Sequence, residues 1–153
     1  TEGVAIIGAD GYSVMVNKVA ELSREYGVTQ QTIEHLLERY GALFEEVLEV
    51  RKDDPTFSHR ISEELPYLRA EIKYAVTHEG ALSVDDVLSR RARINFEAKD
   101  QGLSIVSEVA DLIAPTLQWS EIEKRASIEE YRRKVQDQNN LLTAATENNS
   151  KVG

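Results

Sequence analysis

The sequence contains no cysteine, which excludes disulfides, thiolate-bound metals and a thiol nucleophile. It also has no long apolar run, because the longest, residues 4–7, is far shorter than the roughly 20 residues that a membrane-spanning helix requires. A basic and then apolar leader is missing from the first residues, so no secretory signal is predicted. We therefore expect a soluble, cytoplasmic chain without a membrane span.

Basic residues are scarce as well. Lysine and arginine number 18 against 27 aspartates and glutamates, which gives a net charge of −9. Proteins that bind nucleic acid usually carry a basic surface for the phosphates. The balance therefore predicts no nucleic-acid partner and no attraction to an anionic membrane. One local exception is the arginine cluster at residues 90–93.

The chain is long enough for one domain with a core of its own. It has 153 residues, of which 41% are hydrophobic, and a domain of this size buries about 70% of its unfolded surface. It begins with Thr1 and not with methionine. We interpret this start as a sign that the chain is a piece of a longer polypeptide.

Apolar residues recur at helical spacing in the first third of the chain. One stripe is Met15, Val19, Leu22 and Tyr26, and Gly27 follows as the expected stop. Thr29 is expected to cap a second helix with the stripe Ile33, Leu36, Leu37 and Tyr40. After Gly41, a third stripe comprises Leu43, Phe44, Val47 and Leu48. The turn at residues 53–55 then opens an irregular connector that reaches about Ser62.

Four further helices are expected. Pro66 suits the first turn of a fourth, ended by Gly80, and a fifth runs from a Ser83/Asp86 capping box to about Phe96. A sixth follows Gly102, is apolar on most sides and is shortened or kinked by Pro115. A Ser120/Glu123 capping box starts the seventh. The pattern predicts an all-α fold, a compact bundle of six to seven helices over residues 1–142, with residues 143–153 as a polar, frayed tail.

Few residues suggest chemistry. His35, His59 and His78 lack a second matching ligand pair at helical spacing, so we predict no metal site and interpret them as solvated or capping. Gly8 and Gly11 follow a short apolar run, but a dinucleotide fingerprint needs three glycines. We expect a loop leading into the first helix, and no catalytic or cofactor-binding residue in this segment.

The arginine cluster is the most distinctive local feature. On a regular helix Arg90 and Arg93 share an exposed face, whereas Arg91 falls on the line of the buried side. A buried guanidinium needs a carboxylate partner, so we expect Arg91 to bridge two helices through Glu71 or Glu79. The alternative is phosphate binding by the three arginines.

Two segments are similar to a known family. Residues 65–76 (LPYLRAEIKYAV), Glu79 and residues 82–93 (LSVDDVLSRRAR) together resemble the C-terminal domain of the FAD-dependent, aerobic glycerol-3-phosphate dehydrogenases. Residues 109–119 look like the end of that family's next helix, and residues 8–12 and 35–41 are similar to its linking segment. Ala92 stands where the family usually has threonine, and Gln118 replaces a common glycine.

The resemblance implies a function for the parent enzyme. That enzyme would oxidise sn-glycerol 3-phosphate to dihydroxyacetone phosphate with FAD, and it would be cytoplasmic or peripheral at the inner face of the cell membrane. This segment would be a structural cap that binds no cofactor itself and packs on an N-terminal FAD-binding domain of the same chain. Glu71, Glu79, Arg90, Arg91 and Arg93 are its expected structural or interdomain residues.

Two further expectations accompany this interpretation. A domain separated from its partner should expose an apolar patch, which self-association of the isolated piece could cover. The main alternative is a free-standing helical protein-interaction module with no redox role. A small independent enzyme that uses surface carboxylates is a third hypothesis.

Overall fold

A computed structural model describes the backbone of residues 9–152 and the side chains from Asn17 onward. Over these residues the fold is all-α, as expected, and the only strand-like pairing is an isolated antiparallel bridge between Arg60 and Leu68. The chain divides into two compact units, residues 1–74 and 75–153, and the division falls within α4 (Arg69–Thr77). The expected domain limit at residue 142 stays a prediction.

The first unit begins with two helices that pack together, α1 (Ala9–Tyr26) and α2 (Gln30–Tyr40). Gly27 separates them with a φ of 65°, a left-handed conformation that glycine adopts without steric cost. The Thr29 hydroxyl accepts a hydrogen bond from the Thr32 N–H at 3.1 Å and caps α2. The predicted stop and cap are both confirmed. The Met15 side chain, the first of the predicted stripe, lies outside the described side chains.

A short helical segment follows α2. Gly41, with a φ of 57°, starts the 3-10 turn η1 (Gly41–Leu43), which leads into α3 (Phe44–Glu49). Phe44, Val47 and Leu48 are buried as predicted. Leu43 is not, since it lies in the 3-10 turn and 48% of it is exposed.

The connector between α3 and α4 is irregular, as predicted. It contains the 3-10 turns η2 (Val50–Lys52) and η3 (Pro55–Ser58). The expected helix start at Pro66 is wrong, because α4 begins only at Arg69. Residues near Pro66 are instead paired with the connector, where the Ile61 N–H donates to the Tyr67 carbonyl and the Arg69 N–H donates to the His59 carbonyl.

In the second unit, the predicted fifth helix is interrupted. Residues Asp86–Arg91 form a π-helix, η4, in which the Ala92 N–H donates to the Val87 carbonyl at 2.7 Å. Arg93 then adopts a left-handed conformation with a φ of 57°, and α5 (Ile94–Glu97) starts anew. A π-helix adds a residue to the turn. Ala92 therefore faces the core in place of Arg91, with 4% of its surface exposed.

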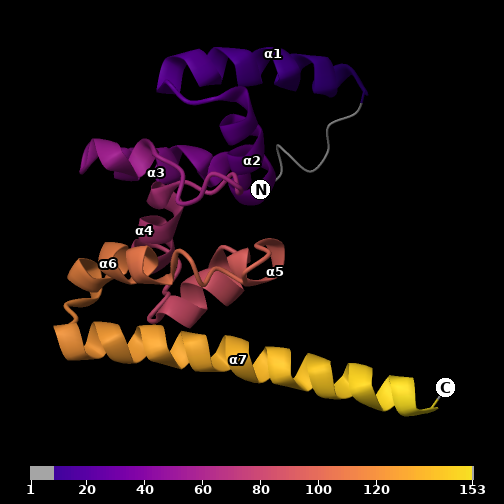
Figure 1. Cartoon of the computed structure of the whole chain (residues 1–153). Helices are drawn as coiled ribbons and strands as arrows, with labels where there is room; N and C mark the ends of the chain where they lie inside the picture. The colour runs from indigo at the N-terminus through magenta and orange to yellow at the C-terminus, as the bar shows by residue number, and fades with distance from the viewer. Residues whose placement is uncertain (1–8, 153) are drawn as a thin grey trace. The chain divides into compact units, whose positions relative to one another are not determined.

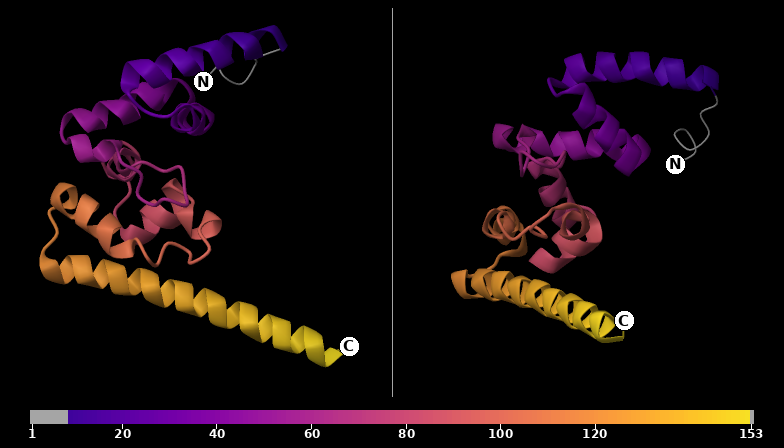
Figure 2. Two further views of the ribbon diagram at one scale, coloured as in Figure 1. Left: turned by 45° about the horizontal axis from the view of Figure 1, so that its top comes forward. Right: turned by 45° about the vertical axis from the view of Figure 1, so that its right-hand side comes forward.

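Two long helices complete the second unit. α6 (Val106–Leu117) packs against α7 (Glu121–Val152), and Figures 1 and 2 show them side by side. The predicted shortening at Pro115 is confirmed, since α6 ends two residues later at Leu117 and is followed by the left-handed Gln118. The buried residues of α6 are Val106, Val109, Ala110 and Ile113. Leu112 is half-buried, so α6 is not enclosed on all of its apolar sides.

The predicted capping box at the start of α7 is confirmed. The Ser120 N–H donates to Glu123 Oε2 at 2.7 Å, and the Glu123 N–H donates to Ser120 Oγ at 3.2 Å. Polar contacts then hold α7 on its unit, because Ser127 Oγ accepts from the Val84 N–H and Lys134 pairs with Asp85 at 2.6 Å. α7 continues to Val152, so residues 143–152 are helical, and fraying of these turns stays a prediction.

Candidate functional site

The most highly organised polar group in the first unit is the carboxylate of Glu71. Its side chain is fully buried, and its Oε1 lies 2.8 Å from Nε2 of His35. The Tyr40 hydroxyl donates to the same oxygen at 3.1 Å, and the Leu68 N–H donates to Oε2 at 2.7 Å. Arg39 Nε stands 4.0 Å away. We call these five residues the Glu71 cluster.

The cluster is formed by two helices of the first unit. Glu71 is the third residue of α4, where a glutamate can reach back to the N–H of the residue that precedes the helix. His35 and Tyr40 come from α2, whose apolar stripe holds that helix against the core. The position of Glu71 therefore explains why α4 starts at Arg69, and it joins that start to α2.

Aromatic rings enclose the cluster. The Arg39 guanidinium carbon lies 5.5 Å from the ring centroids of both Tyr40 and Tyr67, within cation–π range. His35 meets Tyr67 edge-on at 4.8 Å. Rings of this kind keep water from the carboxylate, and each hydrogen bond there is stronger than it would be at the surface.

The geometry of the cluster is that of a structural element. Both oxygens of Glu71 are hydrogen-bonded, and its side chain has no solvent-exposed surface that a substrate could reach. A general acid or base needs to approach the proton that it transfers. The structural role of Glu71 stays a prediction, and its observed partners differ from the predicted ones.

The prediction for Arg91 is wrong. Arg91 is exposed, and the Glu71 oxygens are bound by groups of their own unit, so the expected bridge through a buried guanidinium does not form. The physical reason is the π-helix, which shifts the register by one residue. The spacing of apolar residues does not predict a π-helix. Arg91 lies on the buried face only if the helix is regular.

The neighbouring site candidates are found at the surface or partly buried. Arg90 is mostly exposed, as predicted, and it pairs with Asp86 one turn earlier at 3.5 Å. Arg93 does not share the helical face of Arg90, since Arg93 lies immediately before α5. The Arg93 guanidinium stands 5.8 Å from the Phe96 ring centroid. Glu79 is half-buried, and no hydrogen-bond partner among the described residues reaches its buried Oε1.

The histidines were only partly understood from sequence. His35 was interpreted as solvated or capping, which is wrong, because 13% of its side chain is exposed and it contacts Glu71. The sequence contains a usable signal, since His35 and Arg39 border the apolar stripe of α2, to which Tyr40 belongs. His59 and His78 are exposed. Among the described residues, no group of three or more histidines and carboxylates could hold a metal ion.

The start of the described chain does not fit a dinucleotide. A phosphate-binding glycine loop lies between a strand and a helix, so that the backbone can approach the pyrophosphate. Gly11 instead lies inside α1, which also corrects the expected loop at residues 9–11. Gly8 is outside the described residues. The residues of this chain that are described therefore do not provide a flavin cradle of that type.

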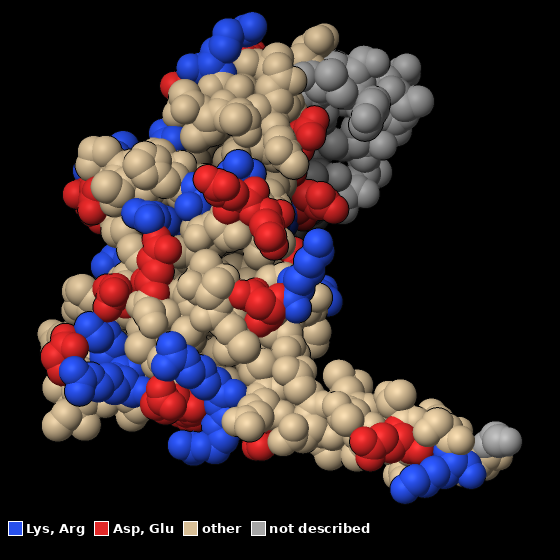
Figure 3. Space-filling model, in the orientation of Figure 1, with Lys and Arg blue, Asp and Glu red and all other residues tan. Residues whose placement is uncertain are grey.

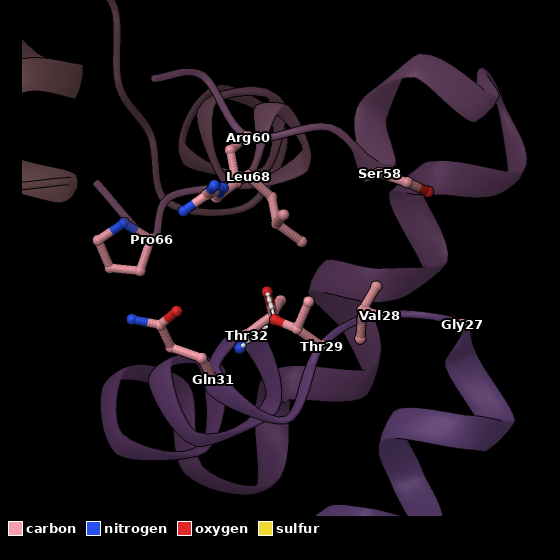
Figure 4. Close-up of a pocket in the computed structure, with 9 residues that line it drawn as sticks. All are labelled: Gly27, Val28, Thr29, Gln31, Thr32, Ser58, Arg60, Pro66 and Leu68. Carbon is pink, nitrogen blue, oxygen red and sulfur yellow. Dashed lines mark hydrogen bonds between the residues drawn. The ribbon is translucent and has the colours of Figure 1, made fainter. Parts of the chain in front are cut away.

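A hollow of about 430 Å³ lies in the first unit and is shown in Figure 4. The connector residues Ser58, Arg60 and Pro66 face the start of α2 across it. Its lining residues include hydroxyls and one arginine but no carboxylate or histidine. This hollow thus lacks a pair of groups for acid–base catalysis.

The second unit exposes several large apolar side chains, as expected for a domain separated from a partner. Phe96 is 68% exposed, Leu141 72% and Leu142 65%. These three help to line a hollow of about 550 Å³ between α5 and α7. Exposed apolar clusters of this kind mark interaction surfaces. Among the described residues, no helix is both long and apolar enough to cross a membrane.

Comparisons with known proteins agree with these features. Residues 1–124 match the family model for the C-terminal domain of alpha-glycerophosphate oxidase. The chain is 38% identical over 136 residues to a glycerol-3-phosphate dehydrogenase of Mycobacterium leprae, covering 89% of this chain and 23% of that protein. It is 37% identical to glycerol-3-phosphate dehydrogenase 2 of Mycobacterium tuberculosis over 136 residues, again 89% of this chain and 23% of that protein.

A mitochondrial glycerol-3-phosphate dehydrogenase of Mesocricetus auratus is 32% identical over 112 residues, which are 71% of this chain and 15% of that protein. The chain thus spans less than a quarter of the length of these curated relatives. No solved structure matches it. Because the family model covers most of its length, the chain belongs to the family described as the C-terminal domain of alpha-glycerophosphate oxidase.

Proposed function

We propose that this chain is the C-terminal structural domain of an FAD-dependent enzyme that oxidises sn-glycerol 3-phosphate to dihydroxyacetone phosphate. The observation that carries the proposal is the match of residues 1–124 to the family model, together with relatives that are glycerol-3-phosphate dehydrogenases over four times as long as the aligned segment. The parent enzyme is cytoplasmic or peripheral at the inner face of the cell membrane. FAD, held by the N-terminal part, supplies the redox chemistry.

The contribution of this domain is to pack on the flavin-binding domain of the same polypeptide. The Glu71 cluster supports this role, because the hydrogen bonds of its fully buried carboxylate join α2 to α4. Glu79, Arg90, Arg91 and Arg93 are proposed as interdomain residues. The three arginines are exposed, so they are accessible to a partner surface.

The reading frame upstream of Thr1 provides the first test. We expect it to encode a glycine-rich dinucleotide fingerprint after a predicted strand, as in a flavoprotein. A frame that starts at Thr1, or one that encodes an unrelated domain, would contradict the proposal.

Deletion of this segment from the full-length enzyme provides the second test of the proposal. We expect the shortened enzyme to lose most of its glycerol-3-phosphate oxidation or to retain FAD poorly. A matched full-length variant with Glu38→Ala, an exposed position of α2, should keep both properties. Unchanged turnover and unchanged flavin content after the deletion would contradict a role in assembling the enzyme.

A free-standing interaction module is the second candidate function. The exposed apolar residues Phe96, Leu141 and Leu142 favour it, since such a module also presents an apolar surface. It differs from the first candidate in predicting no flavoprotein sequence upstream of Thr1.

A further inference from the structure

Glu79 has a buried carboxylate oxygen without a partner. Its Oε1 is enclosed by protein, yet no hydrogen-bond donor among the described residues reaches it. The residue as a whole is half-buried. Buried polar atoms in folded proteins are nearly always hydrogen-bonded, because an unpaired one loses its hydration without a replacement. The described chain therefore supplies only part of the environment that this carboxylate needs.

Glu79 differs in this respect from the other side chains that contain such an atom. These are Arg51, Arg69 and Glu108. Arg51 donates to the Tyr26 carbonyl through another nitrogen, and Arg69 and Glu108 each take part in a further interaction. Glu79 makes no hydrogen bond or ion pair with any described side chain. Its need for a partner is thus the least satisfied of the four.

Other carboxylates of the second unit have cations beside them. Asp85 pairs with Lys134 at 2.6 Å, Asp86 with Arg90 at 3.5 Å, and Asp111 with Lys124 at 3.0 Å. Figure 3 shows the same relation, since basic and acidic side chains lie next to one another over much of the visible face of this unit. The unit thus pairs exposed carboxylates and leaves the more enclosed one without a cation among the described residues.

The turn that contains Glu79 is open on its outer side. It joins α4 to the π-helix η4, and its residues His78, Gly80 and Leu82 are exposed, Leu82 to 69%. A methyl group placed on Gly80 would meet no described atom within 4 Å. A second surface can therefore approach this turn, cover the apolar Leu82 and reach the Glu79 carboxylate beside it.

The position of Glu79 determines the charge of the group that fits there. α4 ends at Thr77, so the carboxylate follows directly after the C-terminal end of that helix. Helix C-termini carry the negative end of the helix dipole and favour cations. The carboxylate and the helix end therefore both attract a positive group, and an ion pair satisfies a partly buried carboxylate better than a neutral donor does.

We infer that Glu79 pairs with a cationic side chain, an arginine or a lysine, of the flavin-binding part of the same polypeptide. The inference rests on the proposed function. Glu79 lies within residues 1–124, which match the family model, and the relatives are over four times as long as the aligned segment. A covalently linked part is present at high effective concentration. A second copy of this chain, in contrast, has a net charge of −9 and is repelled.

The variant Glu79→Gln gives effects of opposite sign in the isolated chain and in the assembly. In the isolated 153-residue chain, a neutral amide is less costly to bury than an unpaired carboxylate. We expect its melting temperature to stay within about 2 °C of the wild type or to rise. Glu147→Gln, at an exposed position of α7 beyond residue 124, is the matched control. Thermal unfolding followed by circular dichroism measures all three chains.

Binding to the separately expressed flavin-binding part should show the loss. We expect Glu79→Gln to raise the Kd at least about tenfold, because the partner's cation loses its carboxylate. Glu79→Lys should raise it further by repulsion, and Glu147→Gln should leave it unchanged. Added salt should weaken the wild-type complex more than the Glu79→Gln complex, since it screens the ion pair. Calorimetric titration at two salt concentrations measures these differences.

Four results would overturn the inference. A Glu79→Gln chain that melts well below the wild type would show that the carboxylate is satisfied within the chain or by bound water. Equal affinity of wild type and Glu79→Gln for the flavin-binding part would leave the proposed function intact and exclude this ion pair. A wild-type chain that does not bind that part at all would contradict the proposed function as well. Self-association that Glu79→Gln abolishes, measured by sedimentation, would assign the cation to a second copy.

Discussion

At the scale of single residues, Glu71 shows how one buried charge determines local structure. A carboxylate removed from water is costly unless its oxygens are hydrogen-bonded. Here His35, Tyr40 and the Leu68 N–H satisfy it, and the same contacts fix where α4 begins. The start of α4 and the burial of a carboxylate thus depend on the same side chain.

Replacing Glu71 should therefore be severely destabilising. In Glu71→Ala the groups that donate to the carboxylate lose their acceptor, and we expect the free energy of unfolding to fall by about 3–5 kcal/mol. Glu38→Ala, at an exposed position of the same α2 that carries His35, should change it by less than about 0.5 kcal/mol. Urea denaturation measures both. If Glu71→Ala lowered the free energy of unfolding no more than Glu38→Ala does, the contribution of the cluster to stability would be contradicted.

The register of the π-helix allows a second prediction at this scale. Arg91 is exposed, so Arg91→Met should change the free energy of unfolding by less than about 0.5 kcal/mol. Ala92 is 4% exposed, and Ala92→Leu should cost about 1–3 kcal/mol through overpacking. A regular helix would bury Arg91, so it predicts that Arg91→Met is the more destabilising of the two substitutions. Thermal unfolding of the two variants distinguishes the registers.

At the scale of elements, much of the helix pattern was predictable from local chemistry. Gly27, Thr29 and the Ser120/Glu123 pair act within one or two turns, and the sequence shows those residues directly. The start of α4 was not predictable in this way. It depends on a bridge to the connector and on a buried carboxylate, both of which require contacts between distant residues.

The same distinction applies to the candidate site. Glu71 was predicted to be a structural residue, and Arg91 was expected to bridge to it or to Glu79, because the periodicity of a regular helix puts Arg91 on the buried face. The π-helix and the left-handed Arg93 break that assumption. His35 was missed since a histidine beside an apolar stripe has no partner in sequence; its partner lies 36 positions away.

The capping box of α7 provides a prediction at the element scale. Ser120→Ala removes the acceptor for the Glu123 N–H and should lower the free energy of unfolding by about 1 kcal/mol. Ser150→Ala is a matched control near the other end of α7, where an exposed serine can be replaced by a better helix former. Chemical denaturation should separate the two. A Ser120→Ala variant as stable as the control would contradict the cap.

The turn before α6 should make stability depend on pH. Hydrogen bonds from Ser104, and to a smaller extent from Gly102, hold the pKa of Asp100 below its ordinary value, against the opposing effect of partial burial. The native state therefore favours the charged form. The resulting stability is present above the unfolded-state pKa of about 3.9 and is lost as the pH falls through the lower folded pKa.

Asp100→Asn should remove this contribution. We expect the variant to be less stable than the wild type at pH 7 and the difference to shrink as the pH falls below about 4. Melting temperatures measured from pH 7 downward test the expectation. A difference that stays constant over this range would show that the charge of Asp100 is not responsible.

At the scale of the whole molecule, the polar groups of the Glu71 cluster are hydrogen-bonded to other groups of the described chain. The carboxylate of Glu71 is enclosed, the hollow of the first unit lacks acids and histidines, and the start of α1 does not form a glycine loop. The chain belongs to a family of C-terminal domains, and its relatives are over four times as long as the aligned segment, which implies a further domain in the same polypeptide. We propose that this further domain is the flavin-binding partner.

Reconstitution of the enzyme from two pieces tests this account most directly. The separately expressed N-terminal flavin-binding part would be assayed for glycerol-3-phosphate oxidation alone and after addition of the 153-residue chain, with the destabilised Glu71→Ala variant as a control. The account predicts that the chain binds the flavoprotein part and raises its rate, and that the variant does so less well. A flavoprotein part that is equally active with and without the chain, and that does not bind it, would contradict the account.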